Sequence, residues 1–312
     1  MKFAFVFPGQ GSQSLGMMAA YGDSAVIRAT FDEASAALGR DLWQLVSEGP
    51  AEALSQTVNT QPLMLTAGIA VWRLWQEKNG ISPGMLAGHS LGEYAALVAA
   101  GVIDLQQAVP LVELRAKAMQ EAVPAGEGAM AAILNLDADK IRAICSEQET
   151  AHAGSAVQAV NFNSPEQTVI AGHKAAVERA AEACKAAGAK RAVMLPVSAP
   201  FHSSLMQPAA ARLQTALASI EFKSPQISVV NNVDVAVESA PEAIKAALVR
   251  QAAAPVRWVE TMRAIQAAGM THVFECGPGK VLAGLTKRCA DLAGGAMNDL
   301  AGVDATLAAV KG

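Results

Sequence analysis

The chain has 312 residues, which is enough for one large domain with an insertion or for two domains. Its formal net charge of −4 and aromatic content of 4% argue against a nucleic-acid-binding protein, which needs basic patches and stacking platforms. The four cysteines are irregularly spaced and form no C-x-x-C pair, so we expect free thiols in a cytoplasmic protein and no metal site.

The first predicted element is a buried strand over 3–7, where five apolar residues precede Pro8. This run is too short for a signal peptide. The longest apolar run, Tyr94–Ile103, is likewise shorter than the ~20 residues of a membrane-spanning helix, so we expect no membrane association.

A glycine loop, Gly9-Gln10-Gly11, follows this strand. It does not match a dinucleotide-binding fingerprint, because the third glycine of that motif is replaced by Ser14. The flanking glycines can instead expose the backbone N–H of Gln10 to an oxyanion, and an ordinary strand-to-helix turn is the alternative.

The pentapeptide Gly88-His89-Ser90-Leu91-Gly92 lies between a predicted strand over 85–87 and a predicted helix over 93–100. A G-x-S-x-G motif in this setting places its serine on a sharp, exposed turn, next to the free N–H groups of a helix N-terminus. The motif predicts acyl chemistry at Ser90, although small-residue-rich chains also contain it by chance.

Further strands over 228–230 and 272–275 alternate with Ala/Leu-rich helices, which predicts an α/β core with helices on both faces of a sheet. Between residues 126 and 197 the pattern changes to strand–helix–strand–strand–helix–strand. This βαββαβ order is typical of a ferredoxin-like unit. We therefore predict a core of residues 1–125 and 198–312 with an inserted subdomain of residues 126–197.

A nucleophilic serine needs a base, and the chain has five histidines. His202 lies in a proline-stiffened loop at the return from the insertion, where a side chain can be held over a cleft. A loop-capping role is the alternative. His272 begins a predicted core strand, which favours a structural role, and neither Glu275 nor Asp234 is a convincing third acid for a catalytic triad.

Seven motifs distributed in order from position 9 to about 288 resemble the malonyl-CoA:acyl-carrier-protein transacylase family, in its stand-alone bacterial type. They are Gly9-Gln10-Gly11-Ser12-Gln13, Gly88-His89-Ser90-Leu91-Gly92-Glu93, Arg115, Asn161-Phe162-Asn163-Ser164-Pro165, Phe201-His202, Gln251 with Pro255-Val256-Arg257-Trp258, and Glu275-Cys276-Gly277-Pro278-Gly279.

The resemblance implies an α/β-hydrolase-like core and a ping-pong reaction through a malonyl-serine intermediate. It implies Ser90 as the nucleophile, His202 as its base, and the backbone N–H groups of Gln10 and Leu91 as the oxyanion hole. It also implies that a main-chain carbonyl at Gln251 orients the histidine. No cofactor is required by this chemistry.

Arg115 is implied as the ligand of the substrate carboxylate, although its neighbours Glu113 and Lys117 would suit a solvated helix face. Phe201 would narrow the acyl pocket in favour of malonyl over methylmalonyl. His89 and Asn161 are further candidates for substrate contact, and Asn161 could equally be a backbone cap.

The implied partners are malonyl-CoA, CoA and acyl carrier protein, and we expect the chain to act as a monomer. An acidic carrier protein calls for a local basic patch, for which the candidates are Lys190, Arg191, Lys287 and Arg288. Two solvated charge pairs are the alternative.

Three other functions remain to be distinguished: a serine esterase or thioesterase, a silent carrier-protein docking module, and a dinucleotide-binding dehydrogenase. The sequence does not separate fatty-acid from polyketide synthesis. Residues 291–312 are weakly patterned and predict only a surface helix or a frayed tail.

Overall fold

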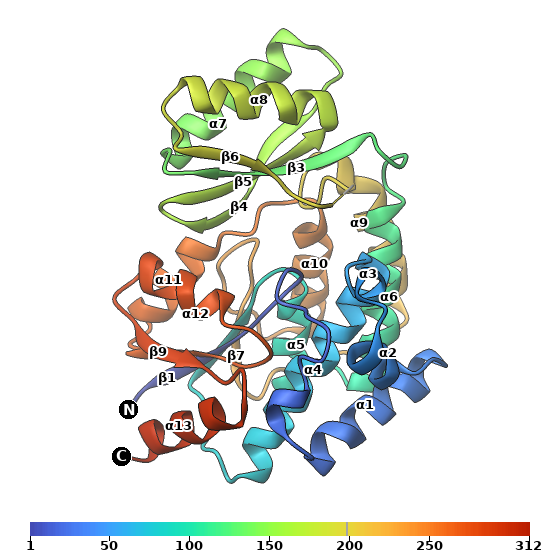
Figure 1. Ribbon diagram of the computed structural model, residues 1–312, viewed down its shortest axis with the longest axis vertical. Coiled ribbons are helices and arrows are strands. Elements are labelled where there is room, and N and C mark those ends of the chain that lie inside the picture. The colour runs from blue at the N-terminus through green and yellow to red at the C-terminus, as the bar shows by residue number, and fades with distance from the viewer. Residues whose placement is uncertain (198) are drawn as a thin grey trace.

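The computed structural model describes residues 1–197 and 199–312, so that Ser198, at the predicted start of the second core segment, lies outside the described residues. Two sheets organise these residues, and the smaller one lies above the larger in Figure 1. The larger is parallel throughout, in the order β7-β2-β1-β8-β9. Its strands are β1 (Phe3–Phe7), β2 (Met85–Gly88), β7 (Ser228–Val230), β8 (His272–Glu275) and β9 (Ala293–Ala296).

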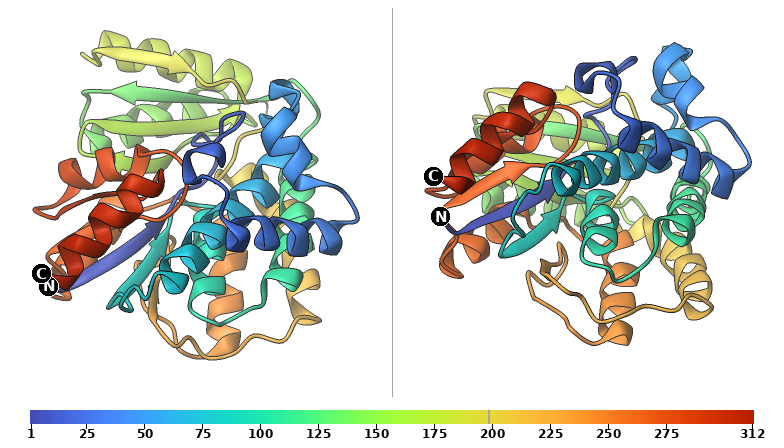
Figure 2. Two further views of the ribbon diagram at one scale, coloured as in Figure 1. Left: turned by 60° about the horizontal axis from the view of Figure 1, so that its bottom comes forward. Right: turned by 90° about the horizontal axis from the view of Figure 1, so that it is seen from below.

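The central strand β1 is buried on both faces, as parallel strands covered by helices are. Phe3, Phe5 and Phe7 belong to the cluster on one face, whereas Ala4 and Val6 belong to the cluster on the other. Figure 2 shows helices on both sides of this sheet. The helices are α1 (Ala25–Leu38), α2 (Leu42–Glu48), α3 (Ala51–Leu54), α4 (Thr57–Glu77), α5 (Gly92–Ala99), α6 (Leu105–Gln120), α9 (Gln207–Ala218), α10 (Pro241–Ala252), α11 (Trp258–Ala267), α12 (Val281–Cys289) and α13 (Leu300–Lys311), with short 3₁₀ turns at Ala19–Tyr21 and Ser204–Met206.

The smaller sheet is antiparallel, in the order β4-β5-β3-β6, which confirms the ferredoxin-like arrangement expected from the sequence. We call this unit the insertion. Its elements are β3 (Gly128–Leu134), α7 (Ala138–Ala151), β4 (Val157–Ser164), β5 (Gln167–His173), α8 (Lys174–Ala186) and β6 (Arg191–Met194).

Alternate residues of β3 face opposite sides of the insertion. Ala131 and Ile133 pack with α7 and α8, whereas Met130 and Ala132 pack with residues of α6 and α9 from the core. Strand β4 also bonds directly to the core, because Phe162 N donates to the carbonyl oxygen of Val256 at 3.0 Å. In return Val256 N donates to Val160 O at 2.8 Å. The insertion is therefore joined to the segment that follows α10.

The C-terminal stretch differs from the sequence-based expectation. Residues 293–296 form β9, which pairs in parallel with β8, and only Leu300–Lys311 is a helix. The sequence Ala-Gly-Gly-Ala has no β-branched or aromatic residue, so its strand conformation follows from pairing and not from propensity. Within the described residues, no helix has both the length and the apolar character required to cross a membrane.

Candidate active site

The serine turn lies at the carboxyl end of β2, where ligand sites of parallel α/β sheets form. Ser90 has a φ of 54°, in the left-handed region that is costly for a non-glycine residue. A Cβ on Gly88 would lie 1.9 Å from the backbone carbon of Gly92, and one on Gly92 would lie 2.1 Å from Phe7 O. The two glycines of the motif therefore permit the tight strand–turn–helix packing that the sequence predicted.

Asn232, in the turn that follows β7, fixes this strained turn. Its Oδ1 accepts the Ser90 N–H at 2.7 Å, and its Nδ2 donates to Gly88 O at 2.7 Å. The sequence analysis did not identify Asn232. The available signal was its place directly after the predicted strand over 228–230, at the same edge of the sheet as Ser90.

Ser90 and His202 are in direct contact, with 2.7 Å between Ser90 Oγ and His202 Nε2. His202 Nδ1 lies 2.9 Å from the carbonyl oxygen of Gln251. Because a carbonyl only accepts, Nδ1 carries the hydrogen and Nε2 is left to accept the serine proton. The geometry thus forms a dyad oriented by a main-chain carbonyl.

Burial lowers the pKa of His202 to about 3, and the nearby charge of Arg115 adds to this effect. The imidazole is therefore neutral at neutral pH. The two acids considered for a triad have other partners: Asp234 pairs with Arg250, and Glu275 accepts the Ala283 N–H at 2.9 Å.

Arg115 lies on α6 and points inward, with only 2% of the residue exposed. Its Nη2 donates to Ser90 Oγ at 3.1 Å and to Gln251 Oε1 at 2.9 Å, and its Nη1 donates to Gln61 Oε1 at 2.8 Å. The guanidinium also lies 5.4 Å from the ring centre of Tyr94. The alternative of a solvated helix face is therefore wrong for Arg115.

Burial lowers the pKa of Arg115. Gln61, a partner that the sequence analysis missed, belongs to a run of buried polar residues, Thr57 and Asn59–Gln61, at the start of α4. Such a run in an otherwise apolar helix was the only signal for it.

A cavity of about 170 Å³ lies over Ser90, between the carboxyl ends of the core strands and the insertion. Eight of the predicted site residues line it. Gln251 does not line the cavity, but it accepts a hydrogen bond from Arg115, which does. The lining consists of Gln10, Gln61, His89, Ser90, Leu91, Arg115, Met119, Met130, Asn161, Asn163, Val169, Leu195, Val197, Phe201 and His202.

The remaining predicted residues have defined places in this cavity. Gln10 follows β1, and its side chain donates to Thr57 Oγ1 at 3.2 Å. His89 Nε2 lies 2.8 Å from Asn163 Oδ1, and burial lowers the pKa of His89. Asn161 is 6% exposed on β4. The contact between His89 and Asn163 joins the serine turn to the insertion.

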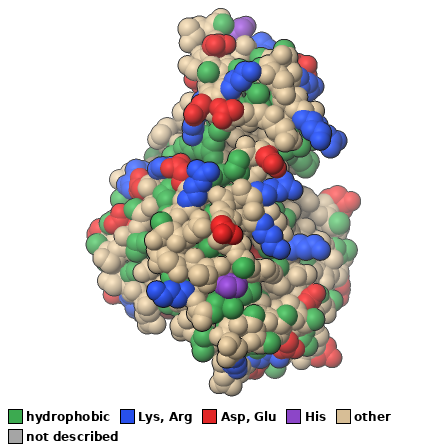
Figure 3. Space-filling model, turned by 90° about the vertical axis from the view of Figure 1, so that its left-hand side faces the viewer, with side chains coloured by type: hydrophobic (Ala, Val, Ile, Leu, Met, Phe, Trp, Pro, Cys, Tyr) green, Lys and Arg blue, Asp and Glu red, His purple; other side chains and the backbone are tan. Residues whose placement is uncertain are grey.

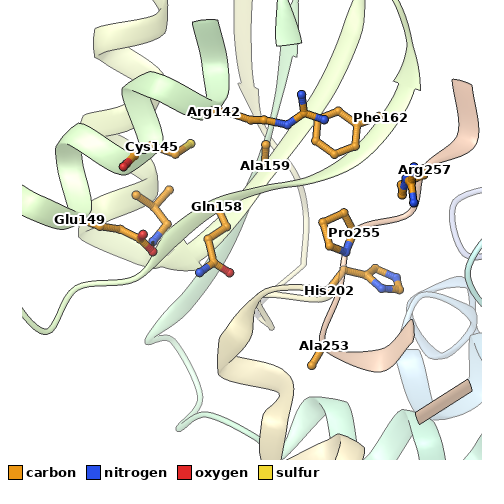
Figure 4. A pocket seen from close by; sticks show the side chains of 12 residues that line it. Arg142, Cys145, Glu149, Gln158, Ala159, Phe162, His202, Ala253, Pro255 and Arg257 are labelled. Atoms are coloured by element: carbon orange, nitrogen blue, oxygen red, sulfur yellow. Dashed lines mark hydrogen bonds between the residues drawn. The ribbon is translucent and has the colours of Figure 1, made fainter. Parts of the chain in front are cut away.

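A second, larger cavity of about 420 Å³ opens on the other side of His202, between the insertion and the core (Figure 4). Arg142 and Phe162 come from the insertion, and Pro255 and Arg257 come from the segment after α10. His202 lines both cavities. Among the described residues, no group of three His, Cys, Asp or Glu side chains is placed to hold a metal ion.

The four basic candidates are exposed and lie outside the cavity over Ser90. Lys190 and Arg191 are at the start of β6, whereas Lys287 and Arg288 are in the last turn of α12. Arg288 lies 3.5 Å from the carboxylate of Glu166 in the insertion. Figure 3 shows Lys and Arg side chains, with acidic ones among them, along the junction of the two lobes.

Comparisons with known proteins agree with this geometry. Residues 4–303 match the model of the acyl transferase domain. The chain is 57% identical over 308 residues to a malonyl CoA-acyl carrier protein transacylase of Escherichia coli K12, covering 98% of this chain and 99% of that protein.

Among solved structures, an acyl-carrier-protein S-malonyltransferase from Burkholderia pseudomallei is 60% identical, with a TM-score of 0.96 and coverage of 99% of this chain and 100% of that one. A malonyl-transacylase solved in complex with a type II polyketide synthase acyl-carrier protein is 56% identical, with a TM-score of 0.97 and coverage of 99% and 100%. The chain therefore belongs to the acyl transferase family, in its malonyl-CoA:acyl-carrier-protein transacylase branch.

Proposed function

We propose that this enzyme transfers a malonyl group from malonyl-CoA to the phosphopantetheine thiol of acyl carrier protein through a malonyl ester of Ser90. One observation carries the proposal: Ser90 Oγ contacts both a neutral histidine, at 2.7 Å, and a buried guanidinium, at 3.1 Å. The neutral histidine can accept the proton of the serine nucleophile, and the guanidinium can bind the carboxylate of the substrate.

In the first half-reaction Ser90 Oγ attacks the thioester carbonyl, and its proton passes to His202 Nε2. The backbone N–H groups of Gln10, after β1, and Leu91, after β2, donate hydrogen bonds to the carbonyl oxygen and stabilise the negative charge that develops there. The carbon–sulfur bond then breaks, and His202 returns the proton to the leaving CoA thiolate. Malonyl-Ser90 and CoA result.

Arg115 supplies the preference for an acid. Its three direct hydrogen-bond partners, Gln61, Gln251 and Ser90, are all neutral, so a malonyl carboxylate adds an anion in direct contact with the guanidinium. An acetyl group leaves the buried cation without it. Phe201, 9% exposed beside His202, limits the width of the acyl pocket, and His89 and Asn161 line the path of the substrate.

In the second half-reaction the carrier thiol gives its proton to His202 Nε2, and its sulfur attacks the ester carbonyl. The bond between the carbonyl carbon and Ser90 Oγ then breaks, and His202 returns the proton to Oγ, which leaves malonyl on the carrier and restores Ser90. The basic candidates are suited to an acidic carrier because all four are exposed cations, and a chain of bonds relates Lys190 to Arg288 across the end of the insertion sheet. Lys190 N donates to Leu134 O at 2.9 Å. Asn135, which follows Leu134, donates its N–H to Glu166 O, and the carboxylate of Glu166 pairs with Arg288. The polyketide carrier bound by the 56% identical relative supports a carrier protein as acceptor.

The product would supply chain extension in fatty-acid or polyketide synthesis. Residues of the chain perform each proposed step, so the proposal includes no cofactor. It places the reaction in the cytoplasm, supported by four cysteines that are all free and buried, and it assigns the activity to a monomer.

Intact-protein mass spectrometry after separate brief exposures to malonyl-CoA and acetyl-CoA tests the proposal. One malonyl adduct on Ser90, little acetyl adduct, no adduct on a Ser90→Ala variant, and loss of the label to phosphopantetheinylated carrier protein are expected. Free malonate without transfer would favour a hydrolase. The absence of both adduct and malonate would favour a docking module.

A further inference from the structure

Glu93 is a buried acid close to the reactive groups but outside the cavity that they line. It lies on α5, three residues after Ser90, and is 2% exposed. Its Oε2 accepts two hydrogen bonds, from Gln251 Nε2 at 3.0 Å and from Asn232 N at 2.8 Å. Both donors belong to residues that hold the dyad, since Gln251 orients His202 and Asn232 fixes the serine turn.

A single amide connects this carboxylate to Arg115. Arg115 Nη2 donates to Gln251 Oε1, and Nε2 of the same amide donates to Glu93 Oε2. The guanidinium is buried, and the three side chains that it contacts through Nη1 and Nη2 are neutral. A buried cation without an anion is costly, and Glu93 is the anion that this amide places next to it.

We propose that Glu93 is the counter-ion of Arg115 in the empty enzyme, coupled to it through the side-chain amide of Gln251, and that it takes up a proton when a malonyl carboxylate binds Arg115. Glu93 is thus a positioning residue that balances charge without touching the substrate. The inference depends on the proposed function, because it requires the substrate carboxylate to lie on Arg115.

The physical basis is competition between two anions for one cation. Burial raises the pKa of Glu93 to about 7, whereas its two hydrogen bonds and the charge of Arg115 act in the opposite direction. A carboxylate on Arg115 cancels the stabilising charge and makes the ionised form of Glu93 less favourable. The proton then comes from solvent and bonds to Oε1, because Oε2 accepts both N–H groups.

Other charged or titratable groups near Glu93 do not supply the same response. Asp234, after β7, acts against ionisation of Glu93 but is held by Arg250, and Tyr94 remains protonated because burial raises its pKa. His202 has a pKa of about 3 and stays neutral when its neighbourhood becomes less positive. Glu238 lines a small cavity beside Glu93.

Titration calorimetry of malonyl-CoA into a Ser90→Ala variant, in buffers of different protonation enthalpy near neutral pH, measures this proton directly. Since the pKa of Glu93 lies near neutral, we expect uptake of a fraction of a proton per malonyl-CoA bound, in excess of acetyl-CoA. Adding Glu93→Gln should abolish the excess while keeping an oxygen able to accept both hydrogen bonds.

Glu275→Gln provides a matched control. Glu275 is a fully buried carboxyl whose pKa burial also raises to about 7, but it bonds to the backbone of Ala283 instead of to the dyad network. In the Ser90→Ala background this substitution should leave the excess proton uptake unchanged. Loss of the excess with Glu275→Gln would contradict the assignment to Glu93.

A second measurement needs no change at Glu93. Because binding takes up a proton, the affinity for malonyl-CoA relative to acetyl-CoA should fall as pH rises through about 7 in the Ser90→Ala variant. A flat ratio, or excess uptake that survives Glu93→Gln, overturns the inference while malonyl-specific binding still supports the proposed function. Malonyl-CoA that binds no better than acetyl-CoA overturns both.

Discussion

The core and the insertion contribute different kinds of side chain to the cavity. Every group proposed to react, to accept a proton or to carry charge comes from the core: Ser90, His202 and Arg115, with the carbonyl of Gln251. The insertion adds apolar residues and two amides, Asn161 and Asn163. The core therefore supplies the chemistry, from the serine turn after β2, from α6, from the end of α10 and from the loop before α9, and the insertion encloses it.

The largest effect should follow from removing the core nucleophile. Ser90→Ala is expected to lower the transfer rate by roughly 10⁴- to 10⁶-fold, because no acyl ester can form. Malonyl-CoA should still bind, since Arg115 and the lining of the cavity remain. Steady-state transfer and equilibrium binding measure the two properties. A variant that still transferred at a tenth of the original rate would place the nucleophile elsewhere.

Arg115→Ala tests whether the core alone selects the acyl group. Loss of a buried charge pair costs about 2–5 kcal/mol, so the preference for malonyl over acetyl should fall by roughly thirty- to several-thousand-fold. The ratio of the two kcat/KM values is the measurement, with Arg115→Lys as the charge-conserving comparison. If the Ala variant kept its malonyl preference, selectivity would have to come from the insertion.

Asn232→Ala should weaken the serine turn without touching the acyl group. The change leaves the Ser90 N–H and the Gly88 carbonyl without their side-chain partner, which costs about 1–3 kcal/mol and should slow acylation by about ten- to a hundred-fold. Asn231→Ala is the matched control, because Asn231 Oδ1 accepts from Asp234 N instead. Equal losses in the two variants would indicate a general effect on stability.

The basic candidates allow the two regions to be compared at the surface. Neutralising all four should raise the KM for carrier protein on the order of ten-fold at low salt, with little change in the KM for malonyl-CoA. Changing Lys190 and Arg191 separately from Lys287 and Arg288 divides the effect between insertion and core. An unchanged carrier KM with all four neutralised would exclude this surface.

The smallest expected effect is in the response to acid. Protonation of Nε2 would block His202 as a base, but its pKa of about 3 keeps it neutral above that range. At saturating malonyl-CoA, the rate of Ser90 acylation should therefore change by less than about two-fold between pH 7 and 5. A loss of rate with a midpoint near 6.5 would show that the histidine titrates as an exposed one.

Local signals in the sequence predicted most of the strands and the serine turn, whereas the roles of Arg115 and Gln251 were implied by the family resemblance. Periodicity identified β1 and the insertion, and the G-x-S-x-G motif identified the serine turn. Gln61, Glu93 and Asn232 acquire roles only through contacts between distant elements, with 54, 158 and 142 positions between some of the bonded residues. Strand β9 was missed for the same reason, since pairing with β8 creates it.

The hydrogen bonds between β4 and Val256 have a consequence for protein engineering. They tie the insertion to the segment that directly follows Gln251, whose carbonyl holds the histidine. In a chimaera that exchanges residues 126–197 alone, a foreign strand would have to pair with the native segment in the same register. Exchanging the insertion together with the segment that follows α10 should preserve the hydrogen bonds between them. The lining that the insertion gives to the cavity could then be changed while the catalytic rate is kept.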